Sequence, residues 1–165
     1  MATTFKLTHH YDQDVETVFA LITDPDFIRR KYEALGGRDI DADREDTGDG
    51  GCKVVTKRTM TIDLPGFAAK VMSPTNTAVQ TEVWQPAGSD GTRRCTYHVD
   101  FQGVPSKVGG TLTLSPDGGG TKQTVEADVK VSIPLIGGKL EKFGIETGTQ
   151  DINEQVDFTI ADLNG

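Results

Sequence analysis

The chain has 165 residues, enough for one domain with a substantial core, and its 25 acidic and 17 basic residues give a net charge of −8. That charge argues against non-specific binding of nucleic acids or anionic membranes, because both need clustered lysines and arginines. No apolar run approaches the roughly 20 residues of a membrane span, so we expect no integral membrane segment.

The N-terminal part is predicted to be a strand followed by two short helices. Residues 3–11 alternate between apolar and polar, which predicts a strand. Asp12 or Asp14 then caps a helix whose apolar residues recur with helical spacing. Asp24-Pro25-Asp26 ends that helix and opens a second one, which Gly36-Gly37 ends. The strand residues predicted to share one face are Phe5, Leu7, His9 and Tyr11.

Strands and turns are predicted for the middle of the chain. Residues 38–46 are acidic and weakly patterned, which is typical of an edge strand. Leu64-Pro65-Gly66-Phe67 interrupts the alternation, and this loop either gates a cavity or forms a packed corner. Pro116-Asp117-Gly118-Gly119-Gly120 is the clearest hairpin turn. The other predicted strands cover residues 52–62, 76–85, 95–101, 108–114 and 125–133.

The C-terminal segment from Pro134 to Leu163 is predicted to form one long helix after a turn at Gly137-Gly138, because no further proline occurs. Its apolar residues lie on two sides rather than in one stripe, with Gly144 and Gly148 between them. A glycine inside a helix costs roughly 1 kcal/mol relative to alanine, so two of them indicate a kink or a need for space. We interpret this helix as the cover of the sheet, with the glycines leaving room beneath it.

The order of elements predicts an α+β fold in which about seven antiparallel strands form a curved sheet around the long C-terminal helix. A sheet with one apolar face needs a cover, and only the C-terminal helix is long enough. No linker, internal repeat or low-complexity tract divides the chain, so residues 1–165 are expected to form a single domain.

Several local motifs resemble the START-like superfamily, the helix-grip proteins that include the birch pollen allergen and the polyketide cyclase/dehydrase-type proteins. The segment Val15 to Pro25 resembles the first helix of that superfamily and its Asp-Pro break. More narrowly, the chain resembles an actinobacterial branch known only as a domain of unknown function. The residues that carry the narrower resemblance are Leu64-Pro65-Gly66-Phe67, Glu82-Val83-Trp84, Gly103-Val104-Pro105, Gly109-Gly110 and Ile133 to Glu141.

The resemblance spans essentially the whole chain. It implies the helix-grip fold and a hydrophobic cavity, which across the superfamily binds lipids, sterols, polyketides or hormones. The narrow branch supplies no catalytic residues, so the resemblance implies a ligand class and no mechanism.

Catalytic and metal-binding sequence patterns are absent, so we expect no cofactor and no metal. His9 and His10 point to opposite faces of a strand, and His98 stands alone. The acidic run 39–49 lacks the register of a calcium loop and is better explained as a solvated edge.

The two cysteines, Cys52 and Cys95, make no disulfide framework. Both fall on apolar strand faces, which favours small buried hydrophobes over reactive thiols. The N-terminus lacks the charged and apolar regions of a signal peptide, so we expect a cytoplasmic protein.

Arg58 is the leading candidate for orienting a ligand. It shares a strand face with Val54, Thr56 and Met60, so an inward orientation would place its charge in an apolar space. There it could bind a carboxylate or phosphate, for which arginine is suited. Alternatively a bulge turns it outward, or Glu82 or Asp100 pairs with it.

Other candidates have simpler structural interpretations. His9 is either a polar group in the cavity or a satisfied structural histidine, and Tyr97 is either core or a hydroxyl offered to a ligand. Trp84 shares a face with Gln80 and Glu82, so we expect it to be half exposed. The predicted ligand-binding residues are Arg58, Met60, Tyr97, Phe101, Leu112, Val129, Gly144, Gly148, Ile152 and His9.

Three functions remain open from the sequence. The leading hypothesis is a non-catalytic protein, monomeric or weakly dimeric, that binds, or binds and transports, a hydrophobic small molecule such as a lipid, sterol or polyketide. The second is a polyketide cyclase or dehydratase that uses His9, Tyr97 or Arg58. The third is a protein-interaction module with a filled core and an exposed Trp84. The fold alone does not decide among them.

Overall fold

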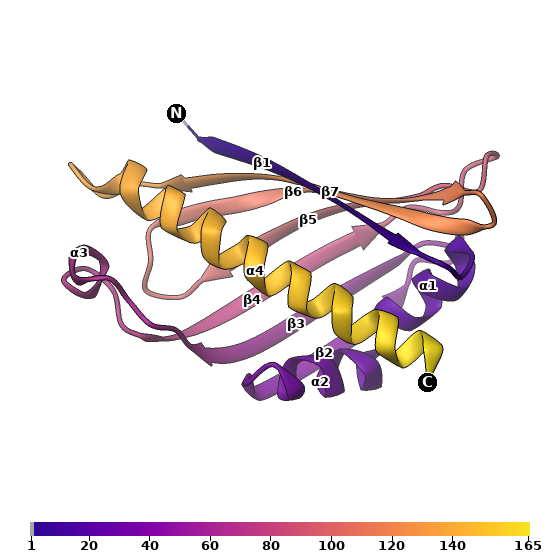
Figure 1. Cartoon of the computed structure of the whole chain (residues 1–165), viewed down its shortest axis with the longest axis horizontal. Helices are drawn as coiled ribbons and strands as arrows, with labels where there is room; N and C mark the ends of the chain where they lie inside the picture. Colours follow the sequence, from indigo (N-terminus) through magenta and orange to yellow (C-terminus); the bar gives the residue numbers. More distant parts are fainter. Residues whose placement is uncertain (1) are drawn as a thin grey trace.

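The computed structural model describes residues 2–165, which form one antiparallel sheet, three short helices and one long helix (Figure 1). The strands are β1 (Thr3–Tyr11), β2 (Arg38–Asp46), β3 (Cys52–Thr61), β4 (Thr75–Trp84), β5 (Arg93–Phe101), β6 (Ser106–Asp117) and β7 (Gly120–Val131). The helices are α1 (Val15–Ile22), α2 (Pro25–Ala34), α3 (Gly66–Ala69) and α4 (Gly137–Asn164).

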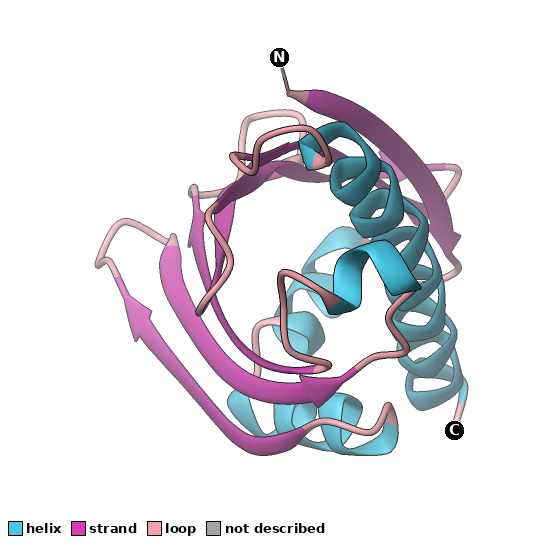
Figure 2. Cartoon of the chain, turned by 90° about the vertical axis from the view of Figure 1, so that its left-hand side faces the viewer, coloured by secondary structure: helices cyan, strands magenta, loops and turns pink. Residues whose placement is uncertain are grey.

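The sheet has seven strands in the order β1-β7-β6-β5-β4-β3-β2, and every neighbouring pair is antiparallel. Strands β2 to β7 follow one another as a meander, while β1 pairs with β7, so that β1 and β2 are the two edges. An end-on view shows the sheet curving around α4, which lies on its concave side (Figure 2). This is the α+β helix-grip arrangement that the sequence predicts, and β2 is the edge strand expected at 38–46.

The two helices after β1 begin at aspartates. Asp14 accepts a hydrogen bond from the Thr17 amide at 2.9 Å and caps α1, so Asp14 rather than Asp12 is the capping residue. Asp24 caps α2 in the same way, accepting from the Phe27 amide at 3.2 Å, with Pro25 in the first turn. These caps fix where α1 and α2 start; α1 lies at one end of the sheet, and α2 lies alongside β2 (Figure 1).

The β6–β7 hairpin uses the turn expected from the sequence. Gly118 and Gly119 have φ angles of 57° and 87°, and Asp117 pairs with Gly120 across them. Two consecutive residues with positive φ form the turn whose twist matches that of a hairpin, and glycine adopts it at little cost.

Helix α4 begins two residues earlier than predicted, at Gly137. The turn before it covers residues 134–136, with Leu135 at a φ of 73°, and Gly137 is already helical, so the prediction of a turn at Gly137-Gly138 was wrong. The helix then continues through Gly144 to Asn164. Near its start, the buried Glu141 accepts hydrogen bonds from the Val131 amide at 2.9 Å and the Thr3 hydroxyl at 2.8 Å. These bonds attach α4 to β7 and β1.

Trp84 is buried rather than half exposed. Only 1% of its surface is accessible, and its ring meets the edge of Phe19 with ring centres 5.2 Å apart. Its indole nitrogen donates to the Glu82 carboxylate at 2.9 Å. The Gln80–Glu82–Trp84 face of β4 therefore points inward, and Val83 on the opposite face is 39% exposed. The polar residues Gln80 and Glu82 misled the prediction because their partners lie on the same strand face.

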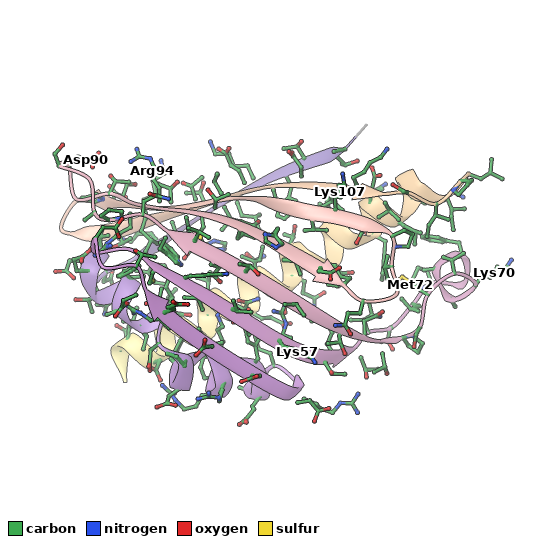
Figure 3. The ribbon with its side chains drawn as sticks, turned by 180° about the vertical axis from the view of Figure 1, so that it is seen from behind. Lys57, Lys70, Met72, Asp90, Arg94 and Lys107 are labelled. Atoms are coloured by element: carbon green, nitrogen blue, oxygen red, sulfur yellow. The ribbon has the colours of Figure 1, made fainter. Side chains whose placement is uncertain are left out.

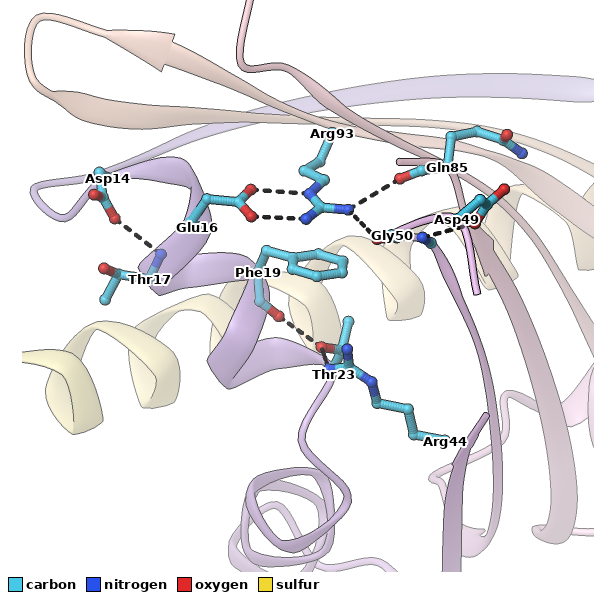
Figure 4. A network of polar contacts seen from close by, with 11 residues as sticks. Asp14, Glu16, Thr17, Phe19, Thr23, Arg44, Asp49, Gly50, Gln85 and Arg93 are labelled. Atoms are coloured by element: carbon cyan, nitrogen blue, oxygen red, sulfur yellow. Dashed lines mark hydrogen bonds and ion pairs between the residues drawn. The ribbon is translucent and has the colours of Figure 1, made fainter. Parts of the chain in front are cut away.

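Arg93 joins α1 to the sheet (Figure 4). Its guanidinium makes two hydrogen bonds to Glu16, at 2.9 and 2.7 Å. It also donates to the carbonyls of Gly50 at 2.7 Å and Gln85 at 3.2 Å, and it stacks 4.0 Å from the centre of the Phe19 ring. All three guanidinium nitrogens of Arg93 therefore donate hydrogen bonds, and these bonds connect β5 to α1 and to the loops that follow β2 and β4.

Candidate functional site

A cavity of about 310 Å³ lies between the sheet and α4. Its walls come from the concave face of β1 and β3 to β7, from α2 and from α4, and α4 contributes residues from Leu140 to Thr159. At 1.5 Å per residue this stretch of helix is roughly 28 Å long, so the space is elongated. The apolar lining includes Phe5, Met60, Ile62, Met72, Val99, Phe101, Val108, Leu112, Val125, Val129, Leu140, Phe143, Ile152 and Val156.

The two glycines inside α4 face this cavity. A Cβ atom at Gly148 would have no other heavy atom within 4 Å, and one at Gly144 would meet only Val129 Cγ1, at 3.9 Å. Any larger side chain at Gly148 would extend into the open space. Their position agrees with the expectation that α4 leaves room beneath it.

Nine of the ten residues predicted to bind a ligand line the cavity. They are Arg58, Met60, Tyr97, Phe101, Leu112, Val129, Gly144, Gly148 and Ile152. Contact with a ligand stays a prediction for each of them.

His9 is not part of the cavity wall formed by residues 2–165. Its Nε2 donates to Asn153 Oδ1 on α4 at 2.7 Å, while its Nδ1 is buried without a partner among the described residues. His9 thus lies outside the cavity wall, and within the described chain only one of its two ring nitrogens has the partner that a structural histidine would require.

Arg58 points inward and is only 6% exposed. It pairs in register with Ala78, and no bulge interrupts β3 where it faces β4. Its guanidinium lies 4.1 Å from the centre of the Tyr32 ring, and Nη2 is 3.8 Å from Asp151 Oδ2. The acid beside it is thus Asp151 on α4, and neither Glu82 nor Asp100 forms an ion pair with it. Its Nη1 is buried and has no hydrogen-bond partner among residues 2–165.

Lys31 is a cavity residue that the sequence analysis missed. It is 8% exposed, and its Nζ lies 4.7 Å from the centre of the Tyr32 ring and 5.7 Å from that of Phe27. Within the described part of the chain it makes no hydrogen bond or ion pair. Burial lowers the pKa of Lys31 from 10.5 to about 8, against the opposing influence of Glu82. Its spacing of four residues from the apolar Phe27 was the signal that could have revealed its inward position.

The two acids at the cavity already have donors. Glu82 accepts from the Gln80 amide at 2.7 Å and from the Trp84 indole. Asp151 accepts from the Gln155 amide at 2.7 Å, and its side chain is 38% exposed. Neither acid accepts a hydrogen bond from Lys31 or Arg58.

Tyr97 adds a neutral hydroxyl to the wall. Burial raises the pKa of Tyr97 to about 12, so the phenol keeps its proton at neutral pH. Its oxygen makes no hydrogen bond to any side chain or backbone group in the described chain. It is available to a ligand as donor or acceptor.

The loop after β3 covers one end of the cavity. Within it, α3 buries Ala68 completely, and Phe67 and Met72 pack against the cluster that contains Leu140. Met72 also lines the cavity, and Figure 2 shows α3 in front of the space enclosed by the sheet and α4. This packing fits the corner interpretation of the loop, and gating by the same loop stays a prediction.

No metal site is found among residues 2–165. No three His, Cys, Asp or Glu side chains come together there in a way that could hold a metal ion. Cys52 and Cys95 are free and buried, and burial raises the pKa of both thiols, as expected for small buried hydrophobes. None of the described helices is long and apolar enough to cross a membrane.

Comparison with sequence families gives one match over most of the chain. The model of the family described as "Protein of unknown function (DUF2505)" matches residues 6–161. A relative from Mycobacterium tuberculosis, "Uncharacterized protein Rv0481c", is 26% identical over 158 residues, which cover 91% of this chain and 88% of that protein.

Solved structures with the same fold are more distant in sequence. The Zhui aromatase/cyclase from a Streptomyces species superposes with a TM-score of 0.66 at 12% identity, over 98% of this chain and 93% of that one. The STAR-related lipid transfer protein from Xanthomonas axonopodis gives 0.63 at 14% identity, over 98% and 86%. At such identities the likeness shows a START-like fold.

Proposed function

Because the chain belongs to the family described as "Protein of unknown function (DUF2505)" and has the START-like helix-grip fold, we propose that it binds a hydrophobic small molecule between the sheet and α4. The observation that carries the proposal is the 310 Å³ cavity, whose largely apolar lining also contains polar and charged side chains, among them Lys31, Arg58 and Tyr97. A lipid, sterol or polyketide is the expected class, and carriage between sites would follow from reversible binding.

Apolar burial would supply most of the affinity, at about 25 cal/mol for each Å² removed from water. Arg58 and Tyr97 would orient the ligand, because Arg58 Nη1 is a buried donor without a partner in the described chain and Tyr97 brings a hydroxyl to the cavity wall. The similarity to a protein named for lipid transfer and to one named as an aromatase/cyclase is compatible with a ligand of this kind.

The direct test is native mass spectrometry of protein purified gently from its own host, followed by organic extraction of anything bound. A stoichiometric apolar ligand is the expected result, and the extract would identify its chemical class. An unliganded mass, together with no thermal stabilisation by a panel of lipids and polyketides, would contradict the proposal.

Gly148→Leu tests whether the space under α4 is the binding site. The leucine side chain would occupy the cavity, while the helix would gain up to about 1 kcal/mol in propensity. We expect ligand affinity to fall at least tenfold, by about 1.4 kcal/mol or more, with no loss of stability in urea unfolding. Gly148→Ala is the control, since it gives a similar propensity gain and fills little volume. Unchanged ligand affinity in the leucine variant would show that Gly148 does not border the binding site.

The enzyme hypothesis keeps two of its three candidate residues in the cavity, Arg58 and Tyr97, whereas His9 is held by Asn153 outside it. Turnover of a polyketide-like substrate that disappears in Tyr97→Phe would favour it. Trp84 is buried and a cavity is present, and both observations count against an interaction module with a filled core.

We further propose that residues 1–165 act as one domain, monomeric or weakly dimeric, in the cytoplasm. The support is that β1 and β2, from the two ends of the sheet order, belong to one continuous sheet. Sedimentation analysis would test the oligomeric state, and cell fractionation would test the location.

A further inference from the structure

Two buried cations at the cavity lack acceptors for their protons. Arg58 is 6% exposed and Lys31 is 8% exposed. Arg58 Nη1 is itself fully buried and has no hydrogen-bond partner within residues 2–165. Lys31 Nζ makes no hydrogen bond or ion pair within the same residues, and its described contacts are with the Tyr32 and Phe27 rings. A buried donor without an acceptor loses its hydration without compensation, so such groups in native proteins need an explanation.

The two cations converge although they come from different elements, α2 and β3. The guanidinium of Arg58 lies 4.1 Å, and the Nζ of Lys31 4.7 Å, from the centre of the same Tyr32 ring. Tyr32 is held in turn by a hydrogen bond from its hydroxyl to Gln155 Oε1 on α4, at 3.3 Å. All four side chains line the cavity, so the donors are grouped around one aromatic ring at its wall.

The acids nearby do not satisfy these donors. Glu82 receives its hydrogen bonds from Gln80 and Trp84. Asp151 is 3.8 Å from Arg58, beyond hydrogen-bonding distance, and it is partly in contact with solvent. What the site lacks is an acceptor that reaches the cavity side of both cations.

From these observations we propose that the cavity selects hydrophobic ligands bearing a single carboxylate, and that Lys31 and Arg58 bind this carboxylate beside the Tyr32 ring. This rests on the proposed binding function and adds the chemistry of the ligand's polar end. A carboxylate offers two oxygens, one for each cation, and arginine is suited to such contacts.

The charge of the site favours one negative charge over two. Lys31 and Arg58 carry two positive charges, and Glu82 and Asp151 already place two carboxylates at the same wall. A doubly charged phosphate would meet more repulsion from these acids than a carboxylate would, since like charges in a poorly solvated site interact strongly. The apolar lining that extends along α4 would receive the hydrophobic body of the ligand.

The experiment measures binding of matched probes by isothermal titration calorimetry. The probes are decanoic acid with decan-1-ol, 2-naphthoic acid with 2-naphthylmethanol, and decyl phosphate, so that chain shape and head group vary separately. We expect each acid to bind at least tenfold more tightly than its alcohol, because hydrogen bonds between charged groups are the strong ones. Decyl phosphate is expected to bind more weakly than decanoic acid.

Two variants test whether Lys31 and Arg58 cause the preference for acids over alcohols. Lys31→Met removes the ammonium and keeps a long unbranched side chain, and Arg58→Met does the same for the guanidinium. Each should reduce the preference for acid over alcohol about tenfold and leave alcohol binding nearly unchanged. Lys57→Met is the control, because Lys57 is next to Arg58 in sequence but exposed on the outer face of β3 (Figure 3).

The outcomes separate this inference from the function on which it rests. Equal binding of acids and alcohols by the unmodified protein would overturn the carboxylate site and leave cavity binding supported. An acid preference that survives both methionine variants, or tighter binding of decyl phosphate than of decanoic acid, would also overturn it. Failure of all five probes to bind would count against both proposals.

Discussion

Replacing Lys31 by methionine should make the protein more stable at neutral pH. Burial lowers the pKa of Lys31 from 10.5 to about 8, which means that the fold disfavours the charged form. At about 1.4 kcal/mol for each tenfold change in proton affinity, this difference corresponds to about 3 kcal/mol at pH 7. The contacts of the ammonium with the Tyr32 and Phe27 rings offset about 1 kcal/mol of that amount. Lys31→Met, which keeps the apolar stem, should therefore gain about 2 kcal/mol.

The stability advantage of Lys31→Met over the wild type should decrease as the pH rises. Between pH 8 and pH 10.5 the folded protein has lost the Lys31 proton while the unfolded chain still holds it, so the wild type gains stability with pH relative to the variant. The difference in unfolding free energy should fall by about 2 kcal/mol between pH 7 and pH 10. Glu82 and Asp151 act against the lowering of the pKa and Arg58 acts with it, and all three are present in both proteins.

Urea unfolding at pH 7 and pH 10, followed by circular dichroism, measures the difference. Lys57→Met is again the matched control, because the exposed Lys57 should change stability by less than about 0.5 kcal/mol at both pH values. The buried tyrosines and cysteines also titrate in alkali, but they are common to wild type and variants. The reasoning is refuted if Lys31→Met is less stable than the wild type at pH 7, or if the difference does not change with pH.

Two further predictions concern the fold. Arg93→Met should lower the unfolding free energy by about 3 kcal/mol, because it leaves two backbone carbonyls and Glu16 without their donor. Glu16→Gln should lower the unfolding free energy by only about 1 kcal/mol, and equal losses of the two variants in urea unfolding would contradict this prediction. Gly110→Ala should lower the unfolding free energy by at least about 3 kcal/mol or prevent folding, because a Cβ there would overlap the Glu126 carbonyl of β7. Gly138 is exposed, so Gly138→Ala should leave stability unchanged or raise it by up to about 1 kcal/mol. Equal thermal midpoints for the two variants would contradict this prediction.

Much of the fold could be predicted because the apolar/polar pattern and the capping residues of each segment favour the same element that the tertiary structure contains. Strands of the sheet have one face on the core, so alternation revealed β1, β5 and β7, and aspartate caps marked the helix starts. The acidic composition of residues 38–46 also revealed β2 as an edge, since an edge strand tolerates solvated charge.

The polar side of the cavity could not be predicted in the same way. Glu82 is inward although charged, because Gln80 and Trp84 on the same strand face donate to it, and alternation alone interprets such a face as outer. The acid beside Arg58 is Asp151, far along the chain on α4, and no spacing rule connects the two. Lys31 was missed because a lysine on a short amphipathic helix is ordinarily solvated.

The two buried arginines differ in how far their hydrogen-bond donors are satisfied. Arg93 and Arg58 are nearly equally buried, at 7% and 6% exposed. Arg93 has four hydrogen bonds that involve all three of its nitrogens, whereas Arg58 has one distant carboxylate and an unpaired Nη1. The fold is thus able to satisfy a buried guanidinium completely at Arg93, whereas the guanidinium at the cavity wall keeps an unpaired Nη1. Lys31 is also disfavoured in its charged form at this cavity, and the helical glycines leave open space there. A ligand with a carboxylate and an apolar body would give both cations an acceptor, fill that space and stabilise the folded state by binding to it.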